Sequence, residues 1–152
     1  MKVKEVMARK VKSLSTEMGV REGMDLLFKM GMGGLPVIDD NKKLAGIFTE
    51  KGVLAKILPS YVDKVGGFVY EENSKAVKQK VQMLKGMKVQ EVMFKDVVTV
   101  KEDATLCEAA RIMITKEARR IPVVDANDEV TGIIARGDIL KAMLSEYQED
   151  SA

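Results

Sequence analysis

The sequence contains no histidine and no tryptophan, and its one cysteine is Cys107. Without an imidazole, the serine–histidine and cysteine–histidine nucleophilic devices are excluded. A zinc site of the usual ligands is nearly excluded as well, and no metal is predicted. A lone cysteine forms no internal disulfide, which fits a reducing cytoplasm, and Cys107 is expected to be a small buried hydrophobe.

Long apolar runs and a strong charge of either sign are also missing. Lys, Glu or Asp interrupts every apolar stretch before the ~20 residues that would span a bilayer. The first five residues, Met-Lys-Val-Lys-Glu, have no apolar stretch behind them and so do not resemble a signal peptide. The 25 basic residues nearly balance the 23 acidic ones, which by itself does not indicate nucleic acid. We therefore expect a cytoplasmic protein without a membrane partner.

What the chain does contain is one pattern written twice. A shift of 86 positions aligns residues 1–58 with residues 87–144 without a gap, and 16 of the 58 pairs are identical. The identities cluster, because Met-Lys-Val opens both copies and Pro-Val and Gly-Ile recur later in each. A chance alignment would need gaps and would scatter its matches, so we interpret the pattern as an internal duplication.

Each copy has the same order of predicted elements, β-α-β-β-α, preceded by a short helical turn. The strands are indicated by short apolar runs and the helices by apolar residues at helical spacing, with Thr105 and Glu108 placed as a capping box in the second copy. The first strand and the strand after the helix are expected to run parallel through a right-handed crossover. The predicted turns, strands and closing helices are 3–7, 11–14, 35–38, 44–48 and 50–58 in the first copy, and 89–93, 97–100, 121–124, 130–134 and 136–147 in the second.

Residues 59–86 have no counterpart in the duplication. A Gly-Gly pair suggests a loop, and apolar residues among lysines over 74–84 predict a short amphipathic helix that covers an edge of the core. The sequence thus divides into a first domain (1–58), a linker (59–86), a second domain (87–147) and a C-terminal tail (148–152).

Three short motifs recur in fixed order in the two copies. Gly-Ile-Phe-Thr-Glu-Lys-Gly at 46–52 and Gly-Ile-Ile-Ala-Arg-Gly-Asp at 132–138 resemble the G-h-x-[ST]-x-x-D signature of cystathionine-β-synthase (CBS) domains, where h is apolar. Leu-Pro-Val-Ile-Asp at 35–39 and Ile-Pro-Val-Val-Asp at 121–125 resemble the h-P-V-h-D strand of that family, and Val-Gln-Glu-Val-Met at 89–93 resembles its opening. The likeness covers both copies, without the linker and the last residues.

The resemblance implies a CBS pair, or Bateman module, with an α/β (α+β) fold in which two CBS domains pack about a pseudo-two-fold axis and leave two clefts. Members of the family commonly bind adenine nucleotides or S-adenosylmethionine there, and pairs often form a disc-shaped homodimer. The chain would then be a stand-alone regulatory module for AMP, ADP, ATP or S-adenosylmethionine. No module of this kind is known as a catalyst in its own right, which agrees with the missing histidine, so the resemblance implies a protein that is not an enzyme and has no catalytic residues. Ligand binding would favour one domain arrangement that an unidentified regulated protein reads.

The residues that match the family's pattern make the two clefts unequal. In the stronger cleft, Asp138 would accept hydrogen bonds from the ribose hydroxyls, and Arg119 and Arg120 would face phosphate. Ala135 stands where the family has Ser or Thr, so one phosphate hydrogen bond is lost. The other residues assigned to this cleft are Ile133, Met7, Lys10, Lys12, Met32, Gly33, Gly34 and Pro36.

The weaker cleft keeps Thr49 at the hydroxyl position but has Gly52 where the family has Asp. Loss of the ribose acceptor removes hydrogen bonds to a charged group, each worth roughly 1.5–3 kcal/mol. We therefore predict that the Asp138 cleft binds at least about tenfold tighter, which gives one good site per chain. The other residues assigned to the weaker cleft are Ile47, Lys51, Met93, Asp96, Val98, Ala118 and Pro122.

Structural interpretations stand beside these roles. Asp138 lies near the start of the last predicted helix and could cap it, while Arg119 and Arg120 could be a solvated pair at a helix end. Two other functions stay open. One is a homodimeric interaction scaffold with vestigial clefts, which Gly52 and Ala135 favour, and the other is a nucleic-acid-binding pair, which only the lysine-rich linker supports.

Overall fold

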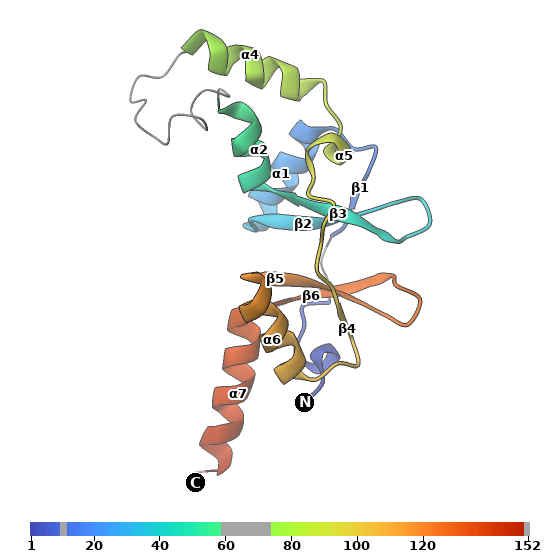
Figure 1. Cartoon of the computed structure of the whole chain (residues 1–152), viewed down its shortest axis with the longest axis vertical. Coiled ribbons are helices and arrows are strands. Elements are labelled where there is room, and N and C mark those ends of the chain that lie inside the picture. The colour runs from blue at the N-terminus through green and yellow to red at the C-terminus, as the bar shows by residue number, and fades with distance from the viewer. Residues whose placement is uncertain (10–11, 59–73, 151–152) are drawn as a thin grey trace. The chain divides into compact units, whose positions relative to one another are not determined.

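The computed structural model describes residues 1–9, 12–58 and 74–150, whose helices and strands are labelled in Figure 1. Contacts divide the chain into two compact units. Unit 1 contains Met1–Lys12, Asn41–Leu44 and Asp96–Ala152, and unit 2 contains Ser13–Asp40 and Ala45–Lys95. The units therefore cut across the sequence repeats, since each takes its opening segment from the other copy.

Unit 2 holds a three-stranded sheet in the order β1-β2-β3, with β1 parallel to β2 as predicted. The first strand begins at Leu14, later than the expected segment 11–14. The elements are β1 (Leu14–Ser15), α1 (Val20–Met30), β2 (Gly34–Ile38), β3 (Leu44–Thr49), α2 (Glu50–Ile57), α4 (Ser74–Lys85) and α5 (Val89–Val92). The buried side chains of this unit include Leu14, Leu27, Leu35, Val37, Phe48, Val53 and Val89.

Unit 1 repeats this plan with the order β4-β5-β6, in which β4 is parallel and β6 antiparallel to β5. The strand predicted over 97–100 is wrong in its bounds, because only its last residue belongs to β4. The elements are η1 (Val3–Glu5), β4 (Val100–Lys101), α6 (Leu106–Lys116), β5 (Arg120–Val124), β6 (Val130–Ala135) and α7 (Arg136–Asp150). Its core cluster is formed by Val3, Met7, Val100, Leu106, Ala109, Met113, Ile121, Val123, Ile134 and Ile139. The α+β fold class predicted from the sequence is thus confirmed.

Backbone hydrogen bonds attach each opening segment to the sheet of its unit. In unit 1, Ala8 donates to the carbonyl of Ile133 (2.9 Å) and accepts from its N–H (3.1 Å). In unit 2, Phe94 and Ile47 form the same pair of bonds, both at 2.9 Å. Since Ala8 and Phe94 are 86 positions apart, as are Ile133 and Ile47, the two attachments are equivalent.

Gly46 and Gly132 allow these segments to come so close. A Cβ at Gly132 would lie 2.6 Å from the carbonyl oxygen of Ala8, and a Cβ at Gly46 would lie 2.5 Å from that of Phe94. Real Cβ contacts are not that short, and backbone cannot move aside as a flexible side chain would. The two glycines of the G-h motifs are therefore required by backbone packing.

A side-chain cap begins α6, and a residue in the left-handed conformation ends both α1 and α6. The Thr105 hydroxyl accepts from the Glu108 N–H (3.1 Å) at the start of α6, which is one of the two bonds of the predicted capping box. Gly31 ends α1 in the left-handed conformation, and Glu117, its counterpart 86 positions later, ends α6 in the same conformation. Cys107 on α6 is exposed, so the prediction of a buried cysteine is wrong. Neighbours of Cys107 at helical spacing, such as Leu106 and Ala109, occupy the buried face instead.

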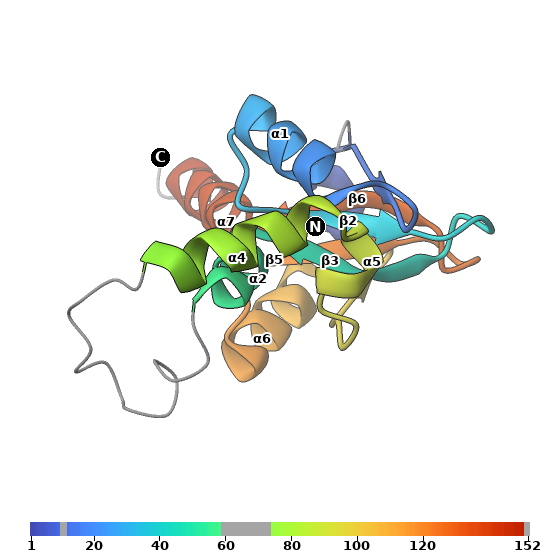
Figure 2. The same cartoon turned by 90° about the horizontal axis from the view of Figure 1, so that it is seen from above.

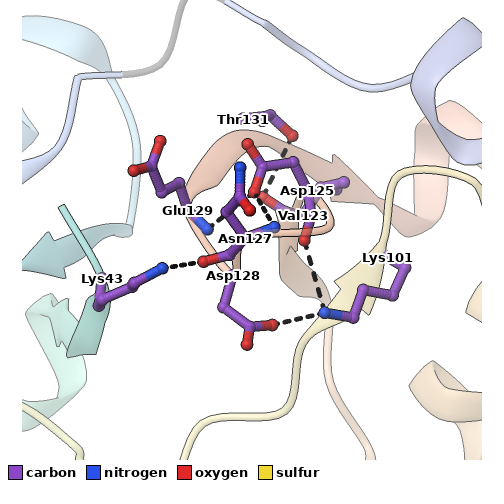
Figure 3. Close-up of polar contacts among 8 residues, drawn as sticks. All are labelled: Lys43, Lys101, Val123, Asp125, Asn127, Asp128, Glu129 and Thr131. Atoms are coloured by element: carbon purple, nitrogen blue, oxygen red, sulfur yellow. Dashed lines mark hydrogen bonds and ion pairs between the residues drawn. The ribbon is translucent and has the colours of Figure 1, made fainter.

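The turn between β5 and β6 is closed by the carboxylate of Asp125, which accepts from the N–H groups of Asn127 (2.8 Å) and Glu129 (3.0 Å) (Figure 3). Two lysines add further bonds to the same turn. Lys101 pairs with Asp128, and the Lys43 ammonium donates to the carbonyl of Asn127. This turn therefore draws on β4 and on the segment Asn41–Leu44, which explains why that segment belongs to unit 1.

The amphipathic helix expected in the linker is present as α4, which contacts α1 and α2 (Figures 1 and 2). Leu84 is buried, whereas Lys75, Lys78 and Lys85 are exposed. The helix thus covers the helical side of unit 2 with its apolar stripe and leaves its lysines in water.

Candidate functional site

Four of the predicted ligand-binding residues come together in unit 1 where β6 passes into α7. Arg120 lies opposite Ala135 in the antiparallel register of β5 and β6. The carbonyl of Arg119 accepts from the N–H of Arg136 (3.0 Å), which ties the start of β5 to the start of α7. The carboxylate of Asp138 reaches back to the same place and accepts from the N–H of Ala135 (2.9 Å).

This last bond shows that Asp138 caps α7, the alternative that the sequence had left open. Ala135 occupies the N-cap position, and Asp138, three residues later, returns to its backbone as an acidic N3 residue does in a capping box. A negative charge in the first turn also opposes the helix dipole. The bond uses Oδ2, and the side chain is only half-buried, so a ligand could still reach Asp138.

The two arginines beside Asp138 are exposed. Within the described ranges, no ion pair or side-chain hydrogen bond joins either guanidinium to another residue. Guanidinium groups of this kind can pair with phosphate in a bidentate manner. The backbone thus brings two arginines to the start of α7 in unit 1, where Asp138 supplies a carboxylate acceptor.

Met7 and Ile133, also assigned to the stronger cleft, are core residues of the same unit, with exposed fractions of 7% and 6%. The sulfur of Met7 would lie 2.8 Å from a Cβ at Gly132, which places Met7 against β6. Lys12 is exposed. Lys10 lies outside the described residues.

Unit 2 brings its own predicted residues to the equivalent position, where β3 passes into α2. The carbonyl of Gly33 accepts from the N–H of Glu50 (2.9 Å), as Arg119 does from Arg136 in unit 1. A Cβ at Gly34 would lie 3.0 Å from the methyl group of Thr49. The hydroxyl of Thr49 accepts from the N–H of Gly52 (2.9 Å) and so caps α2.

The two units therefore cap the N-termini of equivalent helices with side chains from different positions. In unit 2 the N-cap side chain of Thr49 bonds to the backbone of the N3 residue, Gly52. In unit 1 the N3 side chain of Asp138 bonds to the backbone of the N-cap residue, Ala135. Each unit keeps one half of a capping box, and only unit 1 keeps the acid.

Each predicted cleft draws on residues of both units, and its assembly stays a prediction. For the stronger cleft, unit 1 holds Met7, Lys12, Arg119, Arg120, Ile133, Ala135 and Asp138, and unit 2 holds Met32, Gly33, Gly34 and Pro36. For the weaker cleft, unit 2 holds Ile47, Thr49, Lys51 and Met93, and unit 1 holds Asp96, Val98, Ala118 and Pro122. Pro36 and Pro122 are fully buried, so their side chains contribute to strand packing.

Sequence reasoning missed Phe94 and its counterpart Ala8. Phe94 lies beside the start of α2, because a Cβ at Gly52 would be 3.3 Å from its ring atom Cε2. Phe94 is nevertheless 47% exposed. The repeat alignment carried a signal for this pair. It aligns Ala8 with Phe94, and it also aligns Gly52 with Asp138, so the two copies differ at both places.

In the part of the chain that the structure describes, the groups whose pKa is shifted lie outside this set of residues and belong to exposed ion pairs. Hydrogen bonds from Lys4 (2.8 Å) and Lys101 lower the pKa of Asp103 and Asp128, and the partner carboxylate of Asp103 raises the pKa of Lys4. In unit 2, the bond from Lys88 lowers the pKa of Glu17, which in turn raises that of Lys88. These pairs join segments that are distant in sequence and are sensitive to salt and pH.

Within residues 1–9, 12–58 and 74–150, no three His, Cys, Asp or Glu side chains gather in a way that could hold a metal ion. The helices in the same ranges are too short or too polar to cross a membrane.

A duplicated β-α-β-β-α unit, with a Gly-Ile strand that turns directly into a capped helix, defines a tandem-repeat α+β module. The CBS domain family profile matches residues 3–59 and 89–145, and the chain belongs to this family. The family resemblance inferred from the motifs is thereby confirmed.

Similar proteins include the chloroplastic CBS domain-containing protein CBSX1 of Arabidopsis thaliana, 31% identical over 82% of this chain and 56% of its own. The inosine-5′-monophosphate dehydrogenase of Methanocaldococcus jannaschii is 33% identical over 92% of this chain. This chain spans about half the length of the first relative and only 23% of that of the dehydrogenase. The crystal structure of CBSX2 in complex with AMP has a TM-score of 0.73 and 26% identity, and the match covers 96% of this chain and 98% of that one.

Proposed function

We propose that this CBS pair is a regulatory module that binds an adenosine-containing ligand, AMP, ADP, ATP or S-adenosylmethionine, through the residues at the start of α7. Asp138 would accept the ribose hydroxyls through its carboxylate while it caps the helix. Arg119 and Arg120 would neutralise phosphate or, for S-adenosylmethionine, the carboxylate of the amino acid part. The proposal assigns no catalytic role to the chain.

The observation that carries the proposal is the convergence of Asp138, Arg119 and Arg120 within one unit. The carboxylate is held by the 2.9 Å bond to Ala135. Arg120 lies opposite Ala135 in the register of β5 and β6, and the carbonyl of Arg119 accepts from the first N–H of α7. An acceptor for hydroxyls beside two cations is the chemistry that a ribose phosphate requires. CBSX2, whose structure was solved with AMP, supports the same ligand class for a chain of this fold.

Binding would act by shifting a population. A ligand that contacts one arrangement of the domains better than another favours the first by its difference in affinity, and a regulated protein could read the change. The location predicted from the sequence, the cytoplasm, is part of this proposal and is not implied by the chloroplastic relative.

Thermal unfolding with AMP, ADP, ATP, S-adenosylmethionine and a short RNA tests the proposal. A ligand at a hundred times its dissociation constant should add about 2.7 kcal/mol to the free energy of unfolding and raise the melting temperature. The Asp138→Ala variant should lose most of that increase. A flat response to all four adenosine compounds would contradict the proposal, and a response to RNA that falls steeply with salt would favour a nucleic-acid partner.

A second function, a homodimeric scaffold, is favoured by apolar side chains exposed at equivalent helical positions in both units. Ile114 is 80% exposed on α6, and Leu140 and Leu144 are 57% and 60% exposed on α7. Their counterparts 86 positions earlier, Phe28, Leu54 and Leu58, are exposed as well. Exposed apolar groups that gather on neighbouring helices are typical of an interface, and the proposed partner is a second copy of this chain. Dimerisation and ligand binding are compatible, because they use different residues.

A further inference from the structure

The start of α2 in unit 2 differs from the start of α7 in unit 1 by two linked changes. Position 52 has glycine where position 138 has aspartate, and position 94 has phenylalanine where position 8 has alanine. The backbones at these positions are equivalent. Phe94 pairs with Ile47 as Ala8 pairs with Ile133, and the carbonyls of Gly33 and Arg119 accept the first N–H of the helix in each unit. The differences are therefore differences of side chain alone.

The ring of Phe94 takes up the space next to position 52. A Cβ at Gly52 would lie 3.3 Å from Cε2 of the ring and 3.2 Å from the hydroxyl oxygen of Thr49, both closer than ordinary van der Waals contact. The remaining atoms of an aspartate would extend beyond that Cβ into the same crowded space. In unit 1, the alanine methyl group at position 8 offers no such ring.

Phe94 is not held there by burial in the core, since it is among the exposed large apolar residues of the chain. An exposed aromatic over a glycine at the start of a helix is therefore not explained by the packing of unit 2. The same place in unit 1 is where the function proposed above puts the ribose of the ligand, next to Asp138.

We infer that Phe94 occludes the ribose position of unit 2 and so limits the chain to one adenosine ligand. The inference rests on the proposed function. It also goes beyond the loss of an acceptor at Gly52, because the missing carboxylate alone would not explain why unit 2 binds no ligand. Restoring the acid alone would leave the ring in place. Both residues would have to change before the start of α2 could accept a ribose.

Isothermal titration with AMP and, separately, with S-adenosylmethionine tests this by counting sites. The wild-type chain should bind one molecule of the ligand, and Gly52→Asp alone should still bind one. The double variant Phe94→Ala, Gly52→Asp should bind a second molecule. A double variant that folds and binds only one molecule would overturn the inference.

The reciprocal change provides an independent test in unit 1. Ala8→Phe places a ring beside Asp138 and should weaken binding by at least about tenfold, whereas the small substitution Ala8→Ser at the same exposed position should leave the affinity unchanged. If Ala8→Phe binds as the wild type does, occlusion by the ring is wrong. Melting curves without ligand establish that both variants fold. If the wild-type chain binds none of AMP, ADP, ATP and S-adenosylmethionine in the same titration, the proposed function fails, whereas unchanged binding by Ala8→Phe rejects occlusion alone.

Discussion

The carboxylate of Asp138 accepts a hydrogen bond of 2.9 Å from the backbone N–H of Ala135. The residue at the centre of the proposed ligand site is therefore also the cap of α7, and a loss of binding in its variants could arise from either role. The two roles differ in what they need. The cap needs an acceptor of the right shape, whereas the ribose benefits from the full charge of a carboxylate.

Asp138→Asn separates the two roles, because its amide oxygen can still accept from Ala135 while the charge is gone. We expect its free energy of unfolding to stay within about 0.5 kcal/mol of the wild type and its affinity for AMP to fall at least about tenfold. Urea unfolding and calorimetric titration measure these two quantities. Thr105→Ala, which removes the cap of α6 in the same unit, is the control: it should lose about 1 kcal/mol of stability and no affinity. Wild-type affinity in Asp138→Asn would rule out the ribose role.

Gly132→Ala tests the close packing of the opening segment against β6. The new methyl group would lie 2.6 Å from the carbonyl oxygen of Ala8, so one of the two backbones must move. We expect a loss of about 2 kcal/mol in the free energy of unfolding. Gly137→Ala, five residues later, meets nothing within 4 Å and should be neutral or stabilising by up to about 1 kcal/mol. Equal effects of the two substitutions would show that the segment does not depend on the glycine.

Glu117 offers a stabilising substitution. It ends α6 at φ 53°, a left-handed conformation that most side chains disfavour, while its counterpart Gly31 ends α1 at φ 63°. Glu117→Gly should therefore raise the free energy of unfolding by about 1 kcal/mol, and Gly31→Ala should lower it by a similar amount. Chemical denaturation of both variants checks the signs, and a destabilised Glu117→Gly would contradict this account of the cap.

The fold was predictable where the sequence pattern is local. Short apolar runs predicted β2, β3, β5 and β6 to within about two residues, and the helical spacing predicted α1 and α6. The packing of the opening segments was not predictable, because the sequence of a single helical turn does not specify which sheet it packs against. The role of Gly46 and Gly132 became clear only from the close approach of Phe94 and Ala8 in the structure.

The candidate site was predictable to the same degree. The position of Asp138 near the start of the last helix predicted a cap, which is confirmed, whereas its role toward a ribose stays a prediction. The ring of Phe94 was missed because its neighbour Gly52 is 42 positions earlier in the sequence. The two come close only because the opening segment of the second copy packs on the sheet of the first. The prediction that Cys107 is buried was wrong for a different reason. Helical spacing indicates an apolar stripe along the helix, and a residue at the edge of that stripe can face the core or the solvent.

Acid should destabilise the protein partly through the exposed ion pairs of unit 1. The pKa values of Asp103 and Asp128 are lowered by Lys4 and Lys101, so each pair contributes stability that is present above the pKa of the unfolded chain, near 4, and is lost as the pH falls through the lower folded value. The urea midpoint should therefore drop between pH 7 and pH 3. The double variant Lys4→Met, Lys101→Met should have a lower midpoint at pH 7 and a smaller drop. An identical drop in both proteins would show that other carboxyl groups account for it.

The exposed apolar residues of α6 and α7 should determine whether the chain dimerises. Ile114 and Leu140 are 80% and 57% exposed, and a lysine at each would place a charge in any interface that they form. We expect light scattering to find a dimer for the wild type and a monomer for Ile114→Lys, Leu140→Lys. Glu146→Lys is a matched control, because it also adds positive charge to α7 but points about 200° around the helix from Leu144, and it should remain dimeric. Since neither Ile114 nor Leu140 belongs to the Asp138 site, a monomeric variant that still binds AMP would show that ligand recognition is complete within one chain. A dimeric double variant would instead place the interface elsewhere.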